Sequence, residues 1–66
     1  MLRYYNDYAI YVTKIDTDFG HGFSATAYIP KNTGVKENVR EFTTYQRGIK
    51  ATDVVEKMKQ ILDLGL

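Results

Sequence analysis

The stretch Gly22-Phe23-Ser24-Ala25-Thr26-Ala27-Tyr28-Ile29-Pro30 decides the fold that we predict for this chain of 66 residues. Its side chains alternate in character, with Phe23, Ala25, Ala27 and Ile29 on one side and Ser24, Thr26 and Tyr28 on the other. A period of two is typical of a β-strand that buries one face. The two alanines leave room for a bulky element across the apolar face, and the segment that fits is a helix at the C-terminal end of the chain.

Strands are predicted on both sides of this stretch. Residues 2–15 are rich in Tyr, Ile, Val and Thr, which favour strands, although residues 4–7 either extend this strand or form an ordered arm. Residues 39–47 form the third strand, whose mixture of apolar and charged side chains indicates a β-bulge or an edge position. Residues 16–22 and 31–34 connect the strands, because they concentrate the Asp, Asn and Gly that form turns.

A helix is predicted near residues 53–64, with Thr52 or Asp53 as its N-cap and Gly65 at its end. Apolar side chains recur there at helical spacing, at Val54, Met58, Ile61 and Leu62. The predicted fold class is α+β: a three-stranded antiparallel sheet followed by one C-terminal helix packed on one face (β-β-β-α). The whole of residues 1–66 forms a single small domain.

The composition narrows the class of protein. Nine basic against eight acidic residues give a net charge of +1, which is too even to indicate nucleic-acid binding through bulk charge. The chain has no cysteine, no apolar run near the roughly 20 residues that span a bilayer, and no signal-peptide core at its start. We therefore expect a cytoplasmic protein without disulfides or membrane contact. A chain this short buries only about 60% of its unfolded surface, so a homodimer or a bound partner is an expected source of stability.

Candidate catalytic and metal-ligating residues gather in one predicted turn. Asp16, Asp18 and His21 lie there, and Ser24 follows in the next strand. Their spacing matches no established metal-binding loop, and the surroundings of Ser24 resemble no nucleophile elbow. Turn formation accounts for the two aspartates. We therefore expect no catalytic site, no metal site and no cofactor, and we predict that the chain is not an enzyme.

Three tyrosines are predicted to share the outer face of the sheet, which is the face turned away from the helix: Tyr11, Tyr28 and Tyr45. Strand propensity alone explains part of this enrichment. Tyrosine is also typical of protein interfaces, and aromatic side chains on a sheet can stack on nucleotide bases. We predict that the three tyrosines, together with Arg47, contact a partner protein.

A second surface supports the alternative function, which is nucleic-acid binding. Between residues 31 and 50, five basic and two acidic side chains give a local charge of +3. The basic ones are Lys31, Lys36, Arg40, Arg47 and Lys50. A three-stranded sheet with such a hairpin is similar to the β-ribbons that bind DNA. A solvated polar face explains the same charges without any ligand.

The order of these motifs resembles the opening of HicB-like antitoxin domains, small domains with a partial RNase H-like fold. The shared features are a first strand over residues 8–16, an acidic turn with glycine, a second strand that ends at Tyr28-Ile29-Pro30, and a glycine, Gly48, before an acidic-capped helix. The chain differs in the loop after the second strand, where Thr33 and Val35 stand in place of that family's proline and cysteine.

The resemblance implies a function for the chain. It would be a small non-enzymatic protein, encoded by a phage or another mobile element, that neutralises or inhibits a partner protein through its sheet surface. The implied partner is a toxin or a host enzyme. No DNA-binding segment follows Leu66 in this sequence, so the resemblance extends to the partner-binding part of such an antitoxin.

Overall fold

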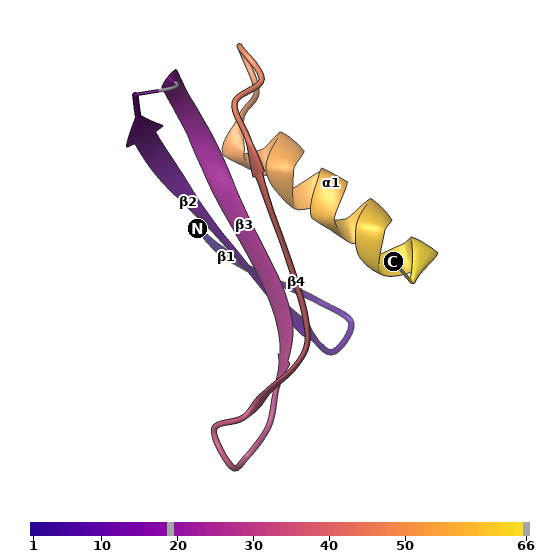
Figure 1. The fold of residues 1–66 in the computed structure, drawn as a ribbon. Coiled ribbons are helices and arrows are strands. Elements are labelled where there is room, and N and C mark those ends of the chain that lie inside the picture. The colour runs from indigo at the N-terminus through magenta and orange to yellow at the C-terminus, as the bar shows by residue number, and fades with distance from the viewer. Residues whose placement is uncertain (19, 66) are drawn as a thin grey trace.

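The fold is an antiparallel sheet with one helix across one of its faces (Figure 1). The computed structural model describes residues 1–18 and 20–65; Phe19, which belongs to the predicted turn 16–22, and Leu66 lie outside the described residues. The elements are β1 (Leu2–Tyr5), β2 (Tyr8–Thr17), β3 (Gly20–Pro30), β4 (Lys36–Thr44) and α1 (Ala51–Leu64). Each strand pairs with the one before it, so the spatial order is β1-β2-β3-β4. The predicted α+β class, with one C-terminal helix on an antiparallel sheet, is confirmed.

The prediction of three strands is wrong, because the segment expected to be one strand over residues 2–15 folds back on itself. Asn6 has a φ of 53°, the left-handed conformation that the first central residue of a two-residue hairpin turn needs. Tyr5 and Tyr8 close this turn. The described part of the chain therefore contains a four-stranded sheet, in which β2 lies between β1 and β3.

Strand β4 lies at the edge of the sheet and contains a β-bulge. Two of its residues, Asn38 and Val39, stand opposite the single residue Tyr28 of β3. Asn38 has a φ of 52°, a conformation that asparagine adopts more readily than most residues. The bulge and the edge position explain the mixed side chains of this segment. The predicted bounds of 39–47 are wrong, since the strand begins and ends three residues earlier.

The core lies between α1 and the two central strands. Its buried side chains come from β2 (Ile10, Val12), from β3 (Ala25, Ala27) and from α1 (Val54, Val55, Met58). Both alanines and Met58 are 0% exposed. Because an alanine side chain is a single methyl group, the helix approaches the sheet closely at these two positions. The predicted packing of the helix against the alanines is confirmed.

Helix α1 begins before the predicted N-cap. Lys50 is the N-cap, and its backbone N–H donates to Oδ2 of Asp53 at 3.0 Å. The predicted N-cap at Thr52 or Asp53 is therefore wrong. Asp53 lies in the first turn of the helix, and its carboxylate caps the helix from there. The negative charge of Asp53 also interacts favourably with the positive end of the helix dipole. Gly65 ends the helix with a φ of 71°, as predicted.

One hydrogen bond joins the N-terminal strand to the end of the helix. The Tyr5 hydroxyl donates to Oδ1 of Asp63 at 2.7 Å. This hydrogen bond is the main reason why the pKa of Tyr5 is raised above its ordinary value of 10.0. An ionised Tyr5 could no longer donate the bond, and its negative charge would be repelled by the Asp63 carboxylate. The Lys59 ammonium also lies 5.4 Å from the centre of the Tyr5 ring. Strand β1 is therefore held by the helix as well as by β2.

Because α1 packs closely on one face of β3, we predict that an added isoleucine lowers the free energy of unfolding on that face and hardly changes it on the other. Ala27→Ile should lower the free energy of unfolding by about 1–3 kcal/mol, because the larger side chain pushes the helix away from the sheet. Thr26→Ile, one residue away on the outer face, keeps a β-branched side chain and should change this free energy by less than about 0.5 kcal/mol. Urea unfolding measures both, and equal destabilisation would contradict the packing described above.

The bond between Tyr5 and Asp63 predicts a pH-dependent contribution to stability. The folded state holds the phenolic proton more tightly than the unfolded state, so this contribution is fully present below about pH 10 and is lost as the pH rises through the raised pKa. Asp63→Ala should lower the pKa of Tyr5 towards 10.0, which NMR titration of the ring carbons measures. Glu41→Ala, on the other face of the sheet, is the control. An unchanged Tyr5 titration in Asp63→Ala would refute the assignment.

Candidate functional site

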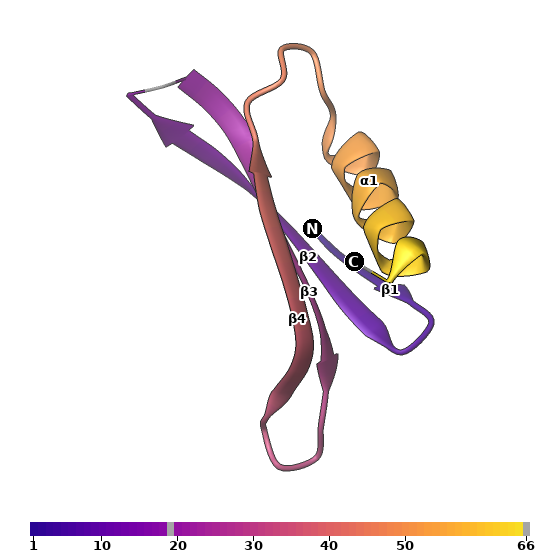
Figure 2. The ribbon, with the colours of Figure 1, turned by 45° about the vertical axis from the view of Figure 1, so that its right-hand side comes forward.

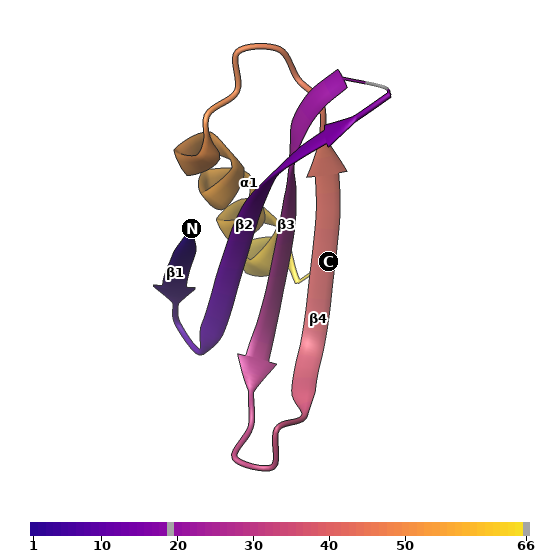
Figure 3. The ribbon, with the colours of Figure 1, turned by 90° about the vertical axis from the view of Figure 1, so that its left-hand side faces the viewer.

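The sheet has one face that no described segment covers. In Figure 3 the strands are seen face-on with α1 behind them, and nothing from residues 1–18 or 20–65 lies over the near side. Residues that pair across neighbouring strands point to the same side, so the register defines which side chains this outer face carries.

Two rows of side chains cross the outer face. One row runs through Tyr4, Ala9 and Tyr28, and the next through Leu2, Tyr11 and Thr26. Tyr4 is 74% exposed and Tyr11 is 48% exposed, whereas Ala9 is only 4% exposed between its two tyrosine neighbours. We use the name tyrosine face for the aromatic and aliphatic residues of this region, which are Leu2, Tyr4, Ala9, Tyr11, Tyr28 and Val39.

Charge is almost absent from the tyrosine face. The charged side chains beside it, Lys36 and Glu41, both belong to the edge strand β4. The Lys36 ammonium lies 4.7 Å from the centre of the Tyr28 ring, which is a cation–π distance. Glu41 pairs with Thr26 at the end of the second row. One positive and one negative charge at the rim leave the middle of the face neutral.

The structure brings together two of the four residues predicted to contact a partner. Tyr11 and Tyr28 lie on neighbouring strands within the tyrosine face. Tyr45 lies past the end of β4, where its Cδ1 is 2.9 Å from the position that a side-chain carbon on Gly22 would take. Gly22 is six residues from Tyr28 along β3, or roughly 20 Å at the rise of an extended strand. Arg47 lies in the loop before α1 and lines a cavity instead.

Sequence reasoning missed Leu2 and Tyr4 as parts of this surface. Both come from β1, and Tyr4 is the most exposed tyrosine among the described residues. The signal that identifies them is Asn6-Asp7, a pair of turn-forming residues between two runs of strand-forming residues. A hairpin at this pair adds β1 to the sheet and thereby places both side chains beside Tyr11.

The basic residues of the nucleic-acid alternative do not form one patch. They are spread over the β3–β4 hairpin, the loop before α1 and the N-cap: Lys31, Lys36, Arg40, Arg47 and Lys50. Lys36 reaches the tyrosine face. Arg40 pairs with Ala27 and so belongs to the helix side of the sheet. Lys31 Nζ lies 3.7 Å from a carboxylate oxygen of Glu37. The structure therefore places one of these five beside the tyrosines.

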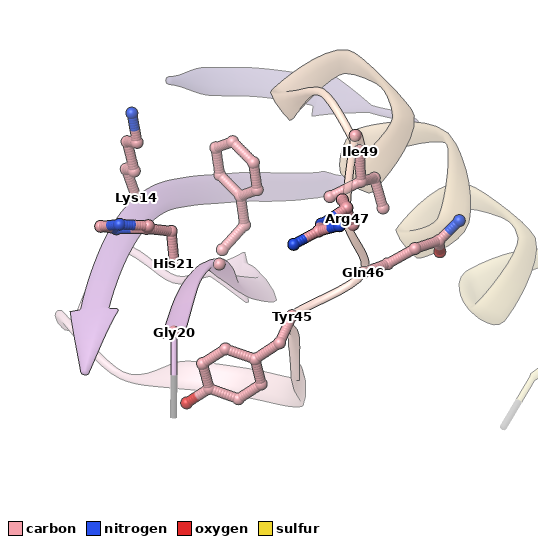
Figure 4. A pocket seen from close by; sticks show the side chains of 10 residues that line it. Lys14, Gly20, His21, Tyr45, Gln46, Arg47 and Ile49 are labelled. Carbon is pink, nitrogen blue, oxygen red and sulfur yellow. The ribbon is translucent and has the colours of Figure 1, made fainter. Parts of the chain in front are cut away.

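A cavity of about 480 Å³ opens at the other end of the sheet, between β2, β3 and the loop of residues 45–50 (Figure 4). We name it the loop cavity. Lys14, His21 and Arg47 are among the residues that line it. His21 Nδ1 lies 3.1 Å from Oδ1 of Asp16, within the turn where the sequence places candidate ligands. In the part of the chain that the structure describes, no group of three or more His, Cys, Asp or Glu side chains is arranged to hold a metal ion.

Comparison with known proteins finds no match: no family model, no curated protein and no solved structure corresponds to this chain. No helix among the described residues combines the length and the apolar character that a bilayer crossing needs. The resemblance to HicB-like antitoxins therefore stays a prediction, and the function has to be inferred from the geometry of the site.

The contact between Gly22 and the end of β4 predicts that a methyl group at position 22 is not tolerated. The added carbon would overlap the Thr44 carbonyl oxygen and would lie 2.9 Å from the Tyr45 ring. Gly22→Ala should lower the free energy of unfolding by about 1–3 kcal/mol and shift the NMR signals of Thr44 and Tyr45, because the backbone has to move. Ser24→Ala, the next residue on the same face, is the matched control. Identical spectra and stability for the two variants would show that the contact is absent.

Proposed function

We propose that this chain is a small non-enzymatic binding protein whose tyrosine face docks on a partner protein and blocks that partner's function. One observation carries the proposal: an uncovered sheet face combines exposed tyrosines with an almost complete lack of charge. Contiguous apolar surface of this kind is typical of interaction sites.

The composition of the tyrosine face corresponds to the centre of a protein interface. Such centres are enriched in tyrosine and depleted in Lys, Glu and Asp. A tyrosine ring contributes a large contact area while only two side-chain torsions lose freedom on binding. Tyr4 and Tyr11, at 74% and 48% exposure, have the most surface to bury in a complex. These two rings are therefore the expected anchors of the contact.

The size of the face also suits a protein partner. With strands about 4.8 Å apart and a rise of about 3.3 Å per residue, the four residues of β1 and the residues paired with them across the other strands cover about 250 Å². A standard interface buries about 800 Å² on each partner. The tyrosine face can therefore supply the centre of one side of a standard interface, and the surrounding rim has to supply the rest.

The expected partner presents a neutral, apolar surface to the tyrosine face. Lys36 and Glu41 stand at the rim, where charges contribute to orientation and association rate more than to affinity. The resemblance to HicB-like antitoxins supports an inhibitory role, with a toxin or a host enzyme as the partner and a phage or mobile element as the source of the gene. We propose that the protein performs this role in the cytoplasm.

Nucleic-acid binding is the second candidate, and one observation favours it. Lys36 stands over Tyr28, next to Tyr11, as in the aromatic platforms on which single-stranded nucleic acids stack. Glu41 on the same face and the dispersal of the other basic residues weigh against it, since binding to phosphates depends on clustered positive charge. The protein partner is therefore the better supported of the two.

The proposal is tested by replacing Tyr4, Tyr11 and Tyr28 with threonine, which keeps the strand propensity and removes the rings. A partner captured from host cells is identified, purified and titrated with each chain by calorimetry. The triple variant should bind at least about 30-fold more weakly, which is the loss expected for one hot-spot contact or more. Tyr45→Thr, outside the face, should bind like the wild type.

Urea unfolding establishes that the triple variant is folded, so that weaker binding is not a loss of structure. Equal binding by the wild type and the triple variant would overturn the proposal. A complex that contains nucleic acid and weakens by orders of magnitude between about 50 and about 500 mM salt would favour the second candidate. A homodimer that dissociates in the triple variant would mean that a second copy of the chain covers the face.

A further inference from the structure

We propose that the loop cavity binds a small organic anion, with a phosphate or carboxylate group carried on an aromatic or apolar body. This site is separate from the tyrosine face and does not depend on the function proposed above. Four observations support it: the place of the cavity in the fold, the unpaired positive charge around it, the direction of Arg47, and the apolar side chains in its wall.

The cavity exists because α1 does not reach this end of the sheet. Lys14 of β2 and Phe23 of β3 pair with each other. On the helix side of the sheet, this pair lies one step beyond the residues that α1 covers. The loop of residues 45–50 passes beside this end before the helix begins at Ala51 (Figure 2). Phe23 and Ile49 line the space between them and are half-buried. The result is an open pocket on the helix side of the sheet.

The charged side chains that line the cavity are basic, and carboxylates lie around it: Asp16 beside His21, and Asp53 and Glu56 in a neighbouring pocket that Arg47 also lines. Among residues 1–18 and 20–65, neither Lys14 nor Arg47 has an ion-pair or hydrogen-bond partner, and no carboxylate lines the cavity. His21 differs, because its ion pair with Asp16 at 3.1 Å offsets the charge that the ring carries when protonated. Lys14 and Arg47 thus provide two positive charges that an anion can neutralise.

The direction of Arg47 fits the recognition of an anion. In Figure 4 its guanidinium points from the loop across the cavity, towards the strands that carry Lys14 and His21. A guanidinium presents a planar fork of donors that matches two oxygens of a carboxylate or a phosphate. The Lys14 ammonium adds a flexible point charge from the opposite side. An anion between them would receive donors from both β2 and the loop.

The apolar part of the wall indicates that the anion belongs to a larger molecule. Phe23, Tyr45 and Ile49 line the cavity together with the charged residues. Its volume of about 480 Å³ lies within the range of about 300–1,000 Å³ that is typical of small-molecule sites, and it exceeds what an inorganic ion would fill. A ring beside Phe23 would gain an aromatic contact while its anionic group faces Arg47.

The test is an NMR titration of the full chain with phenyl phosphate, benzoate, inorganic phosphate and phenol. At least one of the two aromatic anions should bind with a Kd below about 1 mM and shift the amide signals of Phe23, Gly48 and Ile49. Inorganic phosphate and phenol, which each lack one half of the ligand, should bind at least about tenfold more weakly than that anion. The tighter of the two aromatic anions identifies the head group.

Matched variants connect the binding to the residues. Lys14→Gln and Arg47→Gln should each weaken the aromatic anion at least about fivefold, whereas Lys31→Gln, an exposed lysine outside the cavity, should not. Equal weakening by Lys31→Gln, or inorganic phosphate that binds as tightly as phenyl phosphate, would overturn the proposal by showing diffuse attraction to surface charge. The triple tyrosine variant should bind the anion like the wild type, so the failure of one proposal leaves the other intact.

Discussion

The close contact between α1 and the two alanines of β3 determines how the rest of the structure is arranged. Ala25 and Ala27 let the helix lie directly on the central strands, with Val54 and Met58 against them. One helix covers one face of a sheet. Moreover, the 14 residues of α1 span about 21 Å, whereas the 11 residues of β3 extend about 36 Å. Residues 1–18 and 20–65 therefore leave the outer face and one end of the inner face uncovered.

Strand β1 extends both sides of the sheet at once. Its inward residue Tyr5 bonds to Asp63 and fastens the strand to the end of the helix, while its outward residues Leu2 and Tyr4 enlarge the tyrosine face. An edge strand of four residues has few ladder hydrogen bonds of its own. The bond to the helix therefore supports the strand that carries the most exposed tyrosine of the described chain.

The sequence predicts those features that depend on alternation within one element. It predicts the burial of the alanines and the shared face of Tyr11 and Tyr28, because side chains two residues apart in a strand point to the same side. It does not predict the turn at Asn6, since strand-forming residues continue on both sides of it. Tyr45 and Arg47 follow the end of β4, and the path of a loop leaves no periodic signal from which to place them.

The two uncovered surfaces differ in the kind of ligand that each can attract. On the tyrosine face, opposite charges stand at one rim and the centre is neutral, so binding there has to come from the burial of rings. Around the loop cavity, Lys14 and Arg47 are unpaired in the part of the chain that the structure describes, so binding there begins with charge. A single ligand would have to extend around the sheet to contact both the tyrosine face and the loop cavity. The separation of neutral and positive surfaces onto opposite sides of one sheet is the physical reason to expect two independent contacts.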